Sequence, residues 1–380
     1  MIHRAKFTNF KCLADVELDR LGNFATFVGP NGSGKTSVLE ALHYVSKLGT
    51  RKPSEFFDEQ REAATLLRRG ASNSQIGIEI EGDWSGTKGV VHLCVQVSRS
   101  SENGEDREPR FELGANFDDG TQRQPLDKPL VYAPKTRDFG FAVESAVLLR
   151  LNPEELAAPS YSETEQPRIK YDGEGLATVL REMQANRPDA FSDLIESLKA
   201  VVPAVEGVRT RRAPVWKTST RKITVDGESF TGEETEKFMG EEVVFDMEGA
   251  SDLPAHAVSE GTLLVLGLLA VLMNERRPNL VLLDDIEQSL HPKALEDLIG
   301  TLRKLLEKYS DLQILATSHS PYLLDHLDAD EVWLTNLDDD GSTVARRLSE
   351  HPDYEEWADE MSPGEFWSYV GENWVTGTDD

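Results

Sequence analysis

The residues with the most chemical content form a glycine-rich loop that ends in a lysine and a threonine. Positions 29–36 read Gly-Pro-Asn-Gly-Ser-Gly-Lys-Thr. The apolar run 24–28 before the loop predicts a strand, and the apolar spacing within 35–48 after it predicts a helix. In that setting backbone N–H groups and the helix dipole bind phosphates, Lys35 adds a positive charge, and the Thr36 hydroxyl can ligate Mg²⁺. A chance glycine-rich turn is the alternative; because a strand and a helix flank the loop, we predict a nucleoside triphosphate site.

A second candidate group is a pair of carboxylates after an apolar strand. Residues 280–285 read Leu-Val-Leu-Leu-Asp-Asp, as in a buried central strand whose last residues emerge at the phosphate end of a parallel sheet. The first carboxylate, Asp284, would hold Mg²⁺ through its water shell, and Asp285 would orient the water that attacks the γ-phosphate. The alternative, that both acids only solvate the strand end, is disfavoured by the loop upstream.

Two further segments carry residues that could contact phosphates. His319 follows the apolar strand 312–316, where a histidine can donate to a γ-phosphate and report its presence; a purely structural histidine is the alternative. Ser259 and Gly261 precede the apolar stretch 263–273, and a serine and a glycine at a helix N-terminus form an anion site, although an ordinary capped helix looks the same. We interpret all of these groups as parts of one nucleotide site.

The elements that must position these groups are strands and helices in an α/β order. We expect antiparallel strands early in the chain and a mostly helical region at about 139–202. In that region Asp172 would cap the helix 176–183, and Pro188 would lie near the start of the next helix. The other expected elements are strands at 2–10, 16–18, 76–84, 90–97, 110–117, around Ile223 and at 243–247, and a charged helix at 53–69 that Gly70 ends.

Composition limits the class of protein. The chain of 380 residues is long enough for two domains, and its hydrophobic content of 39% suffices for a packed core. Cys12 and Cys94 lie far apart without metal-ligand spacing, which suits a reducing cytosol. No signal-peptide pattern opens the sequence, and the longest apolar stretch, 263–273, is well short of the ~18 residues that span a bilayer. We expect a soluble cytoplasmic protein without a membrane partner.

Charge bears on whether the chain binds nucleic acid. The net charge is −28, from 68 acidic and 40 basic residues, and such a field repels nucleic acid over most of the surface. One basic cluster is followed directly by acids at 233–242. Its members are Arg209, Arg211, Arg212, Lys217, Arg221 and Lys222. We favour a solvated hairpin whose charges partly neutralise each other; a DNA-binding patch is the alternative.

Taken in order, these motifs resemble those of the ABC-type ATPases, and within them the branch that holds RecF, SMC and the OLD-family ATPases, grouped as AAA-family (AAA_21-type) ATPases. The order is the phosphate loop, Ser-Glu-Gly-Thr at 259–262, the acidic strand with Leu-His-Pro at 290–292, and Thr-Ser-His-Ser-Pro at 317–321. The opening Phe-Thr-Asn-Phe-Lys at 7–11, followed by Val-Glu-Leu at 16–18, is similar to the start that these ATPases share. The resemblance covers roughly residues 1–48 and 243–335.

The resemblance implies an α/β fold: an ABC-type P-loop ATPase with an antiparallel β subdomain, a mixed central sheet and an inserted helical subdomain. The ATPase core would comprise 1–138 and 243–340, and 139–242 would be the inserted helical or lid region. Residues 341–380 would be an acidic, aromatic-rich C-terminal segment. Its aromatic residues either pack back onto the core, which we favour, or anchor a partner; they are Trp357, Phe366, Trp367, Tyr369 and Trp374.

The resemblance also implies residue roles. ATP would contact Lys11, Asn31, Gly32, Ser33, Gly34, Lys35, Thr36 and Ser37, and Mg²⁺ would bind at Thr36 and Asp284. Asp285 would be the catalytic carboxylate, His319 the switch histidine, and Glu287 a nearby acid that could assist catalysis. Ser259 and Gly261 would be signature residues that contact the γ-phosphate bound to the opposite subunit. ATP binding would then close a homodimer or a higher homo-oligomer, and hydrolysis would open it.

Three departures from the family pattern matter. Asp285 stands where the family usually has glutamate, and because a misplacement of about 1 Å can cost about 100-fold in rate, we expect slow hydrolysis. We find no convincing Q-loop glutamine between Leu130 and Phe141. We recognise neither a long coiled coil nor a C-terminal Toprim nuclease, so we expect nuclease or toxin activity to come from a separate effector protein.

The leading hypothesis is therefore an ATP-binding and hydrolysing switch that controls a partner effector in anti-phage defence, the role most often implied by compact OLD-like ATPases. The alternative is a RecF-like or SMC-like DNA-repair ATPase that binds duplex DNA, which the net charge disfavours. A nucleotide-binding subunit of a membrane transporter is the third hypothesis. It is the weakest, because of the missing Q-loop, the opening strands and the insertion at 139–242.

Overall fold

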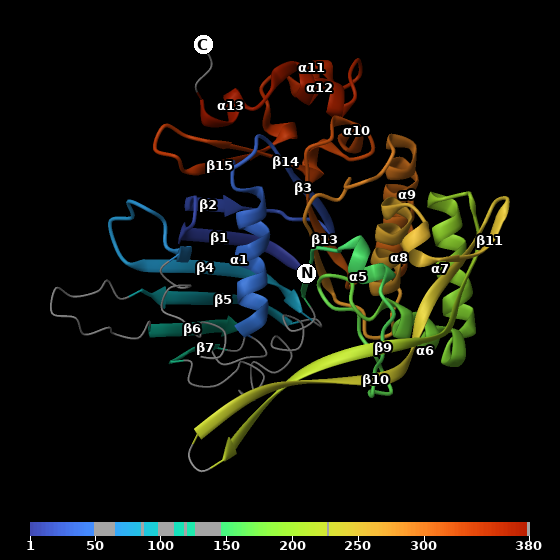
Figure 1. Ribbon diagram of the computed structural model, residues 1–380. Helices are drawn as coiled ribbons and strands as arrows, with labels where there is room; N and C mark the ends of the chain where they lie inside the picture. The colour runs from blue at the N-terminus through green and yellow to red at the C-terminus, as the bar shows by residue number, and fades with distance from the viewer. Residues whose placement is uncertain are drawn as a thin grey trace. The chain divides into compact units, whose positions relative to one another are not determined.

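The chain folds into two compact units in the computed structural model (Figure 1). Unit 1 comprises Met1–Leu148, Pro278–Gln288 and Arg303–Asp380, and unit 2 comprises Leu149–Arg277 and Ser289–Leu302. The structure describes residues 1–48, 65–84, 87–97, 110–117, 120–125, 146–225 and 228–377. Three sequence-based expectations lie outside these residues: the helix over 53–64, the Q-loop segment 130–141, and the start of the helical region at 139–145.

Unit 1 is built on a mixed sheet of six strands in the order β15-β14-β3-β13-β12-β8. Its centre consists of β3 (Phe24–Val28), β13 (Gln313–Ser318) and β12 (Leu280–Leu283), which are parallel and buried throughout. Strands buried on both faces are continuous apolar runs, which is why the sequence predicts them. The parallel register brings their carboxyl ends to one edge, where the segments that carry the motifs begin. The outer strands are β14 (Val332–Leu337), β15 (Thr343–Arg347) and β8 (Val147–Leu149).

A second sheet of unit 1 is antiparallel, in the order β2-β1-β4-β5-β6-β7. Its strands are β1 (Ile2–Phe10), β2 (Leu13–Leu18), β4 (Gln75–Trp84), β5 (Thr87–Gln96), β6 (Arg110–Phe117) and β7 (Gly120–Pro125). In β1, the buried Ala5 and Phe7 alternate with the more exposed polar residues Lys6 and Thr8, the pattern of a half-buried strand. The helix α1 (Lys35–Leu48) follows the phosphate loop and contacts β1, β12 and β13. The predicted early antiparallel strands and the helix after the loop are confirmed. The strand β2 begins at Leu13 instead of residue 16, and β7 was not expected.

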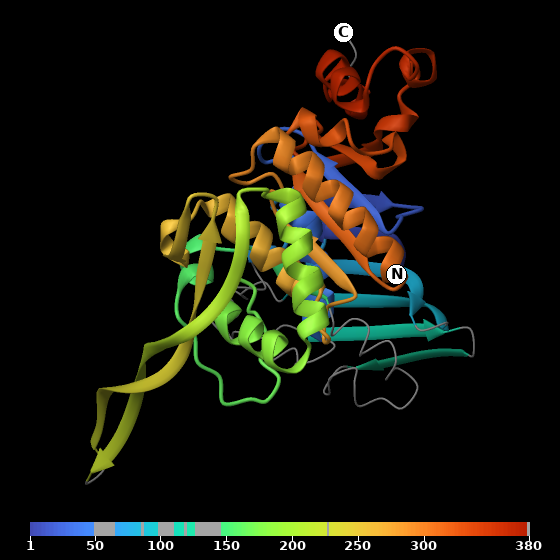
Figure 2. The same ribbon diagram turned by 90° about the vertical axis from the view of Figure 1, so that its right-hand side faces the viewer.

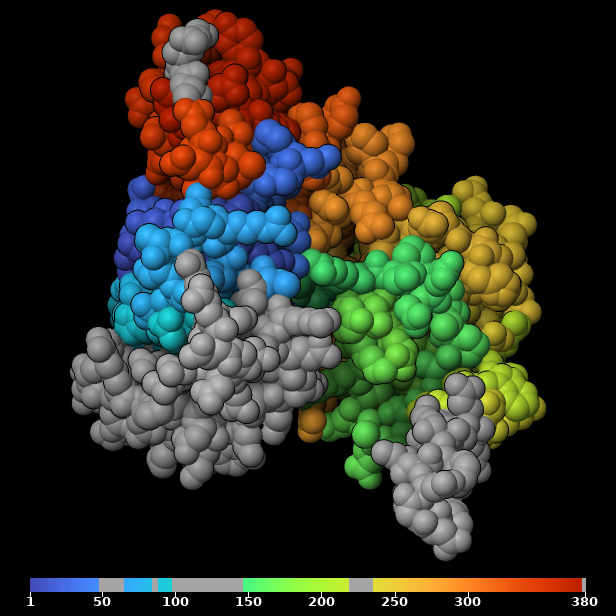
Figure 3. Space-filling model, turned by 60° about the vertical axis from the view of Figure 1, so that its left-hand side comes forward, coloured from blue at the N-terminus to red at the C-terminus, as the bar shows by residue number. Residues whose placement is uncertain are grey.

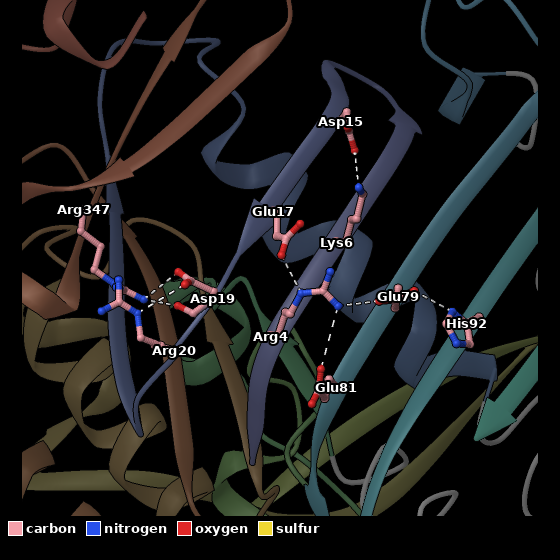
Figure 4. Close-up of polar contacts among 10 residues, drawn as sticks. All are labelled: Arg4, Lys6, Asp15, Glu17, Asp19, Arg20, Glu79, Glu81, His92 and Arg347. Atoms are coloured by element: carbon pink, nitrogen blue, oxygen red, sulfur yellow. Dashed lines mark hydrogen bonds and ion pairs between the residues drawn. The ribbon is translucent and has the colours of Figure 1, made fainter. Parts of the chain in front are cut away.

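Ion pairs join neighbouring strands on the polar face of the antiparallel sheet (Figure 4). Arg4 of β1 lies between Glu17 of β2, at 2.7 Å, and Glu79 of β4, at 2.6 Å. His92 of β5 lies 2.8 Å from the same Glu79. Because exposed pairs contribute at most about 1 kcal/mol each, the fold of this sheet depends on its apolar face, and the pairs mainly favour one strand register.

The C-terminal residues complete unit 1. Figure 3 shows the orange and red residues of this segment lying directly on the blue N-terminal ones. The buried Arg347 of β15 donates to the Asp19 carboxylate at 3.1 Å (Figure 4). Its guanidinium lies 4.6 Å from the centre of the Trp333 ring. The helices of this segment are α10 (Pro321–Leu324), α11 (Tyr354–Trp357), α12 (Pro363–Val370) and α13 (Asn373–Thr376).

Two of the C-terminal aromatic residues pack as expected. Phe366 of α12 and Trp374 of α13 are buried, and His351 lies edge-on to both rings. The helix α13 contacts β14 and β15 of the central sheet. The favoured interpretation, packing onto the core, is therefore confirmed for these two. Tyr369 is 70% exposed, and its ring lies 6.2 Å from that of Trp357 at a tilt of 44°.

Unit 2 is a helical layer with a long β-hairpin. Its elements are α5 (Pro153–Ala157), α6 (Leu176–Asn186), α7 (Pro188–Val201), β9 (Val205–Val225), β10 (Glu228–Met247), β11 (Ala250–Pro254), α8 (Glu260–Leu272) and the first part of α9 (Pro292–Lys308). The helix α8 is apolar on all sides because α5, α6 and α7 surround and bury it. In the described part of the chain, no helix combines the length and the hydropathy that crossing a membrane requires.

The predicted cap of α6 is wrong. Gly175, with φ of 97°, is the N-cap residue, and it has no side chain to cap with. Asp172 instead accepts a hydrogen bond from the backbone N–H of Glu174, at 3.2 Å, within the turn before the helix. Glycine adopts this positive φ without strain, and the sharp entry it allows replaces a side-chain cap. Pro188 is the first residue of α7, as predicted.

The basic cluster lies on the β9–β10 hairpin, which extends past the helices of unit 2 in both ribbon views (Figures 1 and 2). Arg209 donates to Asp252 at 2.8 Å and lies 3.3 Å from Asp246. Arg211 pairs with Glu242 and, at 3.2 Å, with the same Asp252. The prediction that acidic residues partly neutralise the cluster is confirmed for these two arginines. The strands expected near 223 and at 243–247 are the arms of this one hairpin.

Candidate nucleotide site

Two glycines of the phosphate loop lie so close to neighbouring strands that no side chain would fit at their positions. Gly29 has φ of 144°, and a Cβ there would overlap the backbone oxygen of Thr335 in β14. Gly34 has φ of 105°, and a Cβ there would overlap the hydroxyl of Thr343 in β15. Gly32, with φ of 84°, faces open space instead. Glycine is thus required at 29 and 34 for close backbone approach, and at 32 mainly for its backbone angle.

Hydroxyl groups from the C-terminal strands brace the loop. The Ser33 hydroxyl lies 2.6 Å from that of Thr335, which donates to the backbone oxygen of Val28 at 3.0 Å. Thr343 donates to the backbone oxygen of Ser33 at 2.9 Å. All these side chains are buried, so the contacts are shielded from water. Sequence reasoning missed both threonines, because nothing in their spacing distinguishes them from ordinary strand residues.

Lys35 is a buried cation held by neutral groups. Its side chain is 5% exposed, and its ammonium donates to the backbone oxygens of Gly29 and Pro30, both at 2.9 Å. Burial lowers the pKa of Lys35, and the nearby carboxylates, Asp285 foremost, oppose that shift. A buried ammonium whose hydrogen bonds go to carbonyl oxygens fits an anionic phosphate, which would supply the missing counter-charge.

Asp284 joins the loop to the central strands. Its Oδ1 accepts a hydrogen bond from the Thr36 hydroxyl at 2.9 Å and one from the Thr317 hydroxyl at 2.8 Å. Hydroxyl and carboxylate oxygens are the hard ligands that Mg²⁺ prefers. No cluster of three or more histidine, cysteine or acidic side chains suited to a metal occurs in the described residues. The donor set therefore fits a cation that takes most of its ligands from phosphate and water.

Asp285 and His319 come together at the ends of β12 and β13. Asp285 adopts the left-handed region with φ of 53°, and its backbone N–H donates to the Thr317 hydroxyl at 2.8 Å. Its Oδ1 lies 3.9 Å from His319 Nε2, and both side chains are partly exposed. The structure thus places an accessible carboxylate and an imidazole side by side, next to the carboxylate that contacts Thr36.

Glu287 holds the backbone of the histidine. Its Oε1 accepts a hydrogen bond from the His319 backbone N–H at 2.6 Å. Its Oε2 is buried and has no hydrogen-bond partner among the described residues. Among the described residues, Glu287 therefore contacts the backbone of His319.

The other predicted nucleotide contacts lie around the loop. Asn31 and Gly32 are exposed at its tip, and the Ser37 hydroxyl lies 3.5 Å from the Cys12 sulfur. The ammonium of Lys11 forms an ion pair with Glu40 of α1, so its charge is already partly balanced. Whether these residues touch nucleotide stays a prediction.

The signature residues belong to unit 2, whereas the loop and the carboxylates belong to unit 1. Ser259 is the exposed N-cap of α8, and its hydroxyl accepts from the Thr262 backbone N–H at 3.3 Å. Gly261 is buried, and a Cβ there would overlap the backbone oxygen of Ser289. The Ser289 hydroxyl donates to Glu260 at 3.2 Å, which ties the start of α8 to the segment after the paired carboxylates.

Comparison with known proteins places the chain in a family. The AAA_21 family, described as "AAA domain, putative AbiEii toxin, Type IV TA system", matches residues 24–325, which is more than half of the chain. The OLD nuclease of Thermus scotoductus is 24% identical over 377 residues, covering 92% of this chain and 65% of that protein. The DNA replication and repair protein RecF of Kineococcus radiotolerans is 30% identical over 141 residues, covering 32% of this chain and 34% of that protein. The chain thus spans about a third of the RecF relative and just under two thirds of the OLD nuclease.

Solved structures agree on the fold. An SMC head bound to the C-winged helix domain of ScpA superposes with a TM-score of 0.57 at 14% identity, covering 92% of this chain and 98% of that one. The SMC head domain from Thermotoga maritima gives a TM-score of 0.50 at 13% identity, covering 91% of this chain and 98% of that one. At these identities the likeness shows the fold alone, an α/β SMC-head-like ABC ATPase fold with a mixed central sheet and antiparallel sheets. The chain belongs to the AAA_21 family of ATPases, is similar in sequence to OLD nuclease and RecF, and shares the ABC ATPase fold of the SMC heads.

Proposed function

We propose that the chain binds ATP with Mg²⁺ and hydrolyses it at the edge of the central sheet of unit 1. The observation that carries this proposal is the set of contacts that joins the phosphate loop, through Thr36, to Asp284 and Thr317. The loop N–H groups and Lys35 would bind the β- and γ-phosphates, with Lys35 exchanging carbonyl oxygens for phosphate oxygens. Thr36 and Asp284 would hold Mg²⁺, which would neutralise charge on the phosphates.

Asp285 would act as the base or water-orienting group, and His319 would donate to the γ-phosphate. The separation of 3.9 Å between Asp285 Oδ1 and His319 Nε2 supports a joint role, because one reacting phosphate could contact both groups. Aspartate is one methylene shorter than the glutamate usual in this family. We therefore propose slow turnover, which suits a switch better than an enzyme that consumes ATP for flux.

We further propose that ATP closes a dimer. Ser259 is exposed at the N-terminus of the 13-residue helix α8, where backbone N–H groups and the helix dipole favour an anion. A γ-phosphate bound to the loop of a second copy would supply that anion. Closure on binding and opening on hydrolysis would then control a partner effector, and the family description and the likeness to OLD nuclease favour a role in anti-phage defence.

The test compares wild type with Lys35→Ala and Asp285→Ala. A fluorescent ATP analogue reports binding, phosphate release reports hydrolysis, and light scattering after size exclusion reports mass. We expect Lys35→Ala to lose binding, and Asp285→Ala to bind ATP, lose hydrolysis and accumulate as a dimer. Wild-type hydrolysis by Asp285→Ala would refute the catalytic assignment, and an unchanged mass on adding ATP would refute the dimer.

A DNA-repair ATPase is the second candidate, favoured by the likeness to RecF. Against it, Arg209 and Arg211 of the hairpin already pair with acidic side chains. Duplex DNA binding that weakens steeply with salt and vanishes when Arg209, Arg211 and Arg212 are changed to glutamate would establish this alternative.

A further inference from the structure

A buried threonine lies directly beside the paired carboxylates. Thr317 lies in β13, two residues before His319, and its side chain is fully buried. Its hydroxyl donates to Asp284 Oδ1 at 2.8 Å and accepts the backbone N–H of Asp285, also at 2.8 Å. Its backbone oxygen accepts the N–H of Ile286 at 3.1 Å. One residue thus contacts three consecutive positions of the turn after β12.

The hydrogen bond that the Thr317 hydroxyl donates fixes the direction of the one that it accepts. A hydroxyl has one proton, so once that proton goes to Asp284, only a lone pair is left for the N–H of Asp285. Asp285 needs such support because φ of 53° is unfavourable for a residue with a Cβ. The hydroxyl of Thr317 therefore orients the side chain of Asp284 and stabilises the strained backbone of Asp285 at the same time.

Thr317 is also independent of the phosphate loop. The other hydroxyl on Asp284 Oδ1 comes from Thr36, a loop residue that nucleotide binding engages. Thr317 belongs to a central strand whose neighbours are fixed by parallel pairing with β3. Its contact with Asp284 is thus supplied by the rigid sheet, the kind of element that positions catalytic groups well.

We propose that Thr317 is a positioning residue for hydrolysis: it sets the directions of Asp284 and Asp285 while the loop alone sets nucleotide affinity. This inference rests on the proposed ATPase function. Removing the hydroxyl frees the Asp285 backbone and displaces the carboxylate from the attacking water. A displacement of about 1 Å lowers the turnover number about 100-fold.

The test uses Thr317→Val, which keeps the branched shape and removes the hydroxyl, and Thr317→Ser, which keeps the hydroxyl. The matched control is Thr26→Val in the adjacent strand β3. Thr26 is equally buried, and its hydroxyl oxygen has no hydrogen-bond partner in the described part of the chain. For each variant, steady-state hydrolysis gives kcat and KM, a fluorescent ATP analogue gives Kd and its Mg²⁺ dependence, and thermal melting checks the fold.

We expect Thr317→Val to lower kcat about 100-fold, with Kd for the analogue within about threefold of wild type. Its Mg²⁺ requirement for binding would rise, because Asp284 loses one of the two hydroxyl contacts that orient it. Thr317→Ser would recover most of the activity, and Thr26→Val would match wild type. If Thr317→Val proves too unstable to purify, Thr317→Cys, with a weaker hydrogen-bonding group of similar size, takes its place and is expected to show the same selective loss of kcat.

Two outcomes would overturn the inference. Hydrolysis by Thr317→Val within about twofold of wild type would show that the hydroxyl positions nothing. A lower kcat together with weaker binding and a lower melting temperature, without recovery in Thr317→Ser, would show that the residue is merely structural. The Lys35→Ala variant separates these outcomes from failure of the proposed function: if wild type and Lys35→Ala hydrolyse ATP equally slowly, the ATPase assignment fails, and the inference fails with it.

Discussion

Replacing Thr335 by valine tests whether the C-terminal strands hold the phosphate loop in shape. The Thr335 hydroxyl is fully buried, donates to the Val28 backbone oxygen at 3.0 Å and lies 2.6 Å from the Ser33 hydroxyl. Valine keeps the side-chain shape and removes both contacts. At about 1 kcal/mol for each of the two lost hydrogen bonds, plus about 1–3 kcal/mol for leaving the buried Ser33 hydroxyl unpaired, the free energy of unfolding falls by about 3–5 kcal/mol.

The same substitution weakens nucleotide binding. Ser33 belongs to the turn that would surround the phosphates, and Thr343 alone would then brace it. If ordering the loop around nucleotide then costs about 1.4 kcal/mol more than in wild type, the affinity for nucleotide falls about tenfold. Urea denaturation measures the first effect, and titration with a fluorescent ATP analogue measures the second.

The control is Thr26→Val, whose hydroxyl oxygen has no hydrogen-bond partner in the described residues. The change from threonine to valine is identical, and both sites are buried in neighbouring strands of one sheet. We expect the control to be neutral or slightly stabilising, and Thr335→Ser to retain binding. Equal effects of Thr335→Val and Thr26→Val on unfolding, or unchanged nucleotide affinity, would refute the proposed bracing.

Three further predictions address the charged groups and the dimer. Because burial lowers the pKa of Lys35, the unfolded chain binds this proton more tightly, so nucleotide-free stability rises with pH between the lowered value and 10.5. Lys35→Met should abolish that slope and raise the melting temperature at neutral pH while losing ATP binding; a lower melting temperature would contradict it. Asp285→Glu should speed phosphate release about tenfold or more by restoring the missing methylene, and a slower variant would show that the turn fits aspartate only. Ser259→Arg should prevent ATP-dependent dimerisation in light scattering without changing nucleotide affinity, and a dimer that still forms would place the interface elsewhere.

Local patterns account for what the sequence predicted well. The loop at 29–36 and the run ending in Asp284 and Asp285 are contiguous, and their flanking strands are buried and apolar. Such signals need no knowledge of the tertiary fold. His319 is a candidate for the same reason, because it directly follows a buried strand, and its role stays a prediction.

The residues that sequence reasoning missed depend on register. Thr317, Thr335 and Thr343 are ordinary β-branched strand residues. Thr335 and Thr343 contact the loop because β14 pairs with β3 and β15 pairs with β14, and Thr317 contacts the paired carboxylates because β13 pairs with β12. Ser33 and Thr335 are 302 positions apart, a pairing that no spacing rule can anticipate. The wrong cap at Asp172 has a similar origin, since the backbone of Gly175 decided where the helix begins.

The C-terminal segment reaches the phosphate loop through a short series of contacts. The Asn336 side chain donates to the backbone oxygen of Glu372 at 3.2 Å, and the Trp367 indole donates to the Glu372 carboxylate at 3.1 Å. Asn336 directly follows Thr335, and Glu372 is one of the carboxylates that raise the pKa of Lys35. Displacing α13 would therefore release Asn336 and remove a negative charge from the surroundings of Lys35. The α13 segment is thus connected to the phosphate loop through Asn336 and its neighbour Thr335, which contacts Ser33.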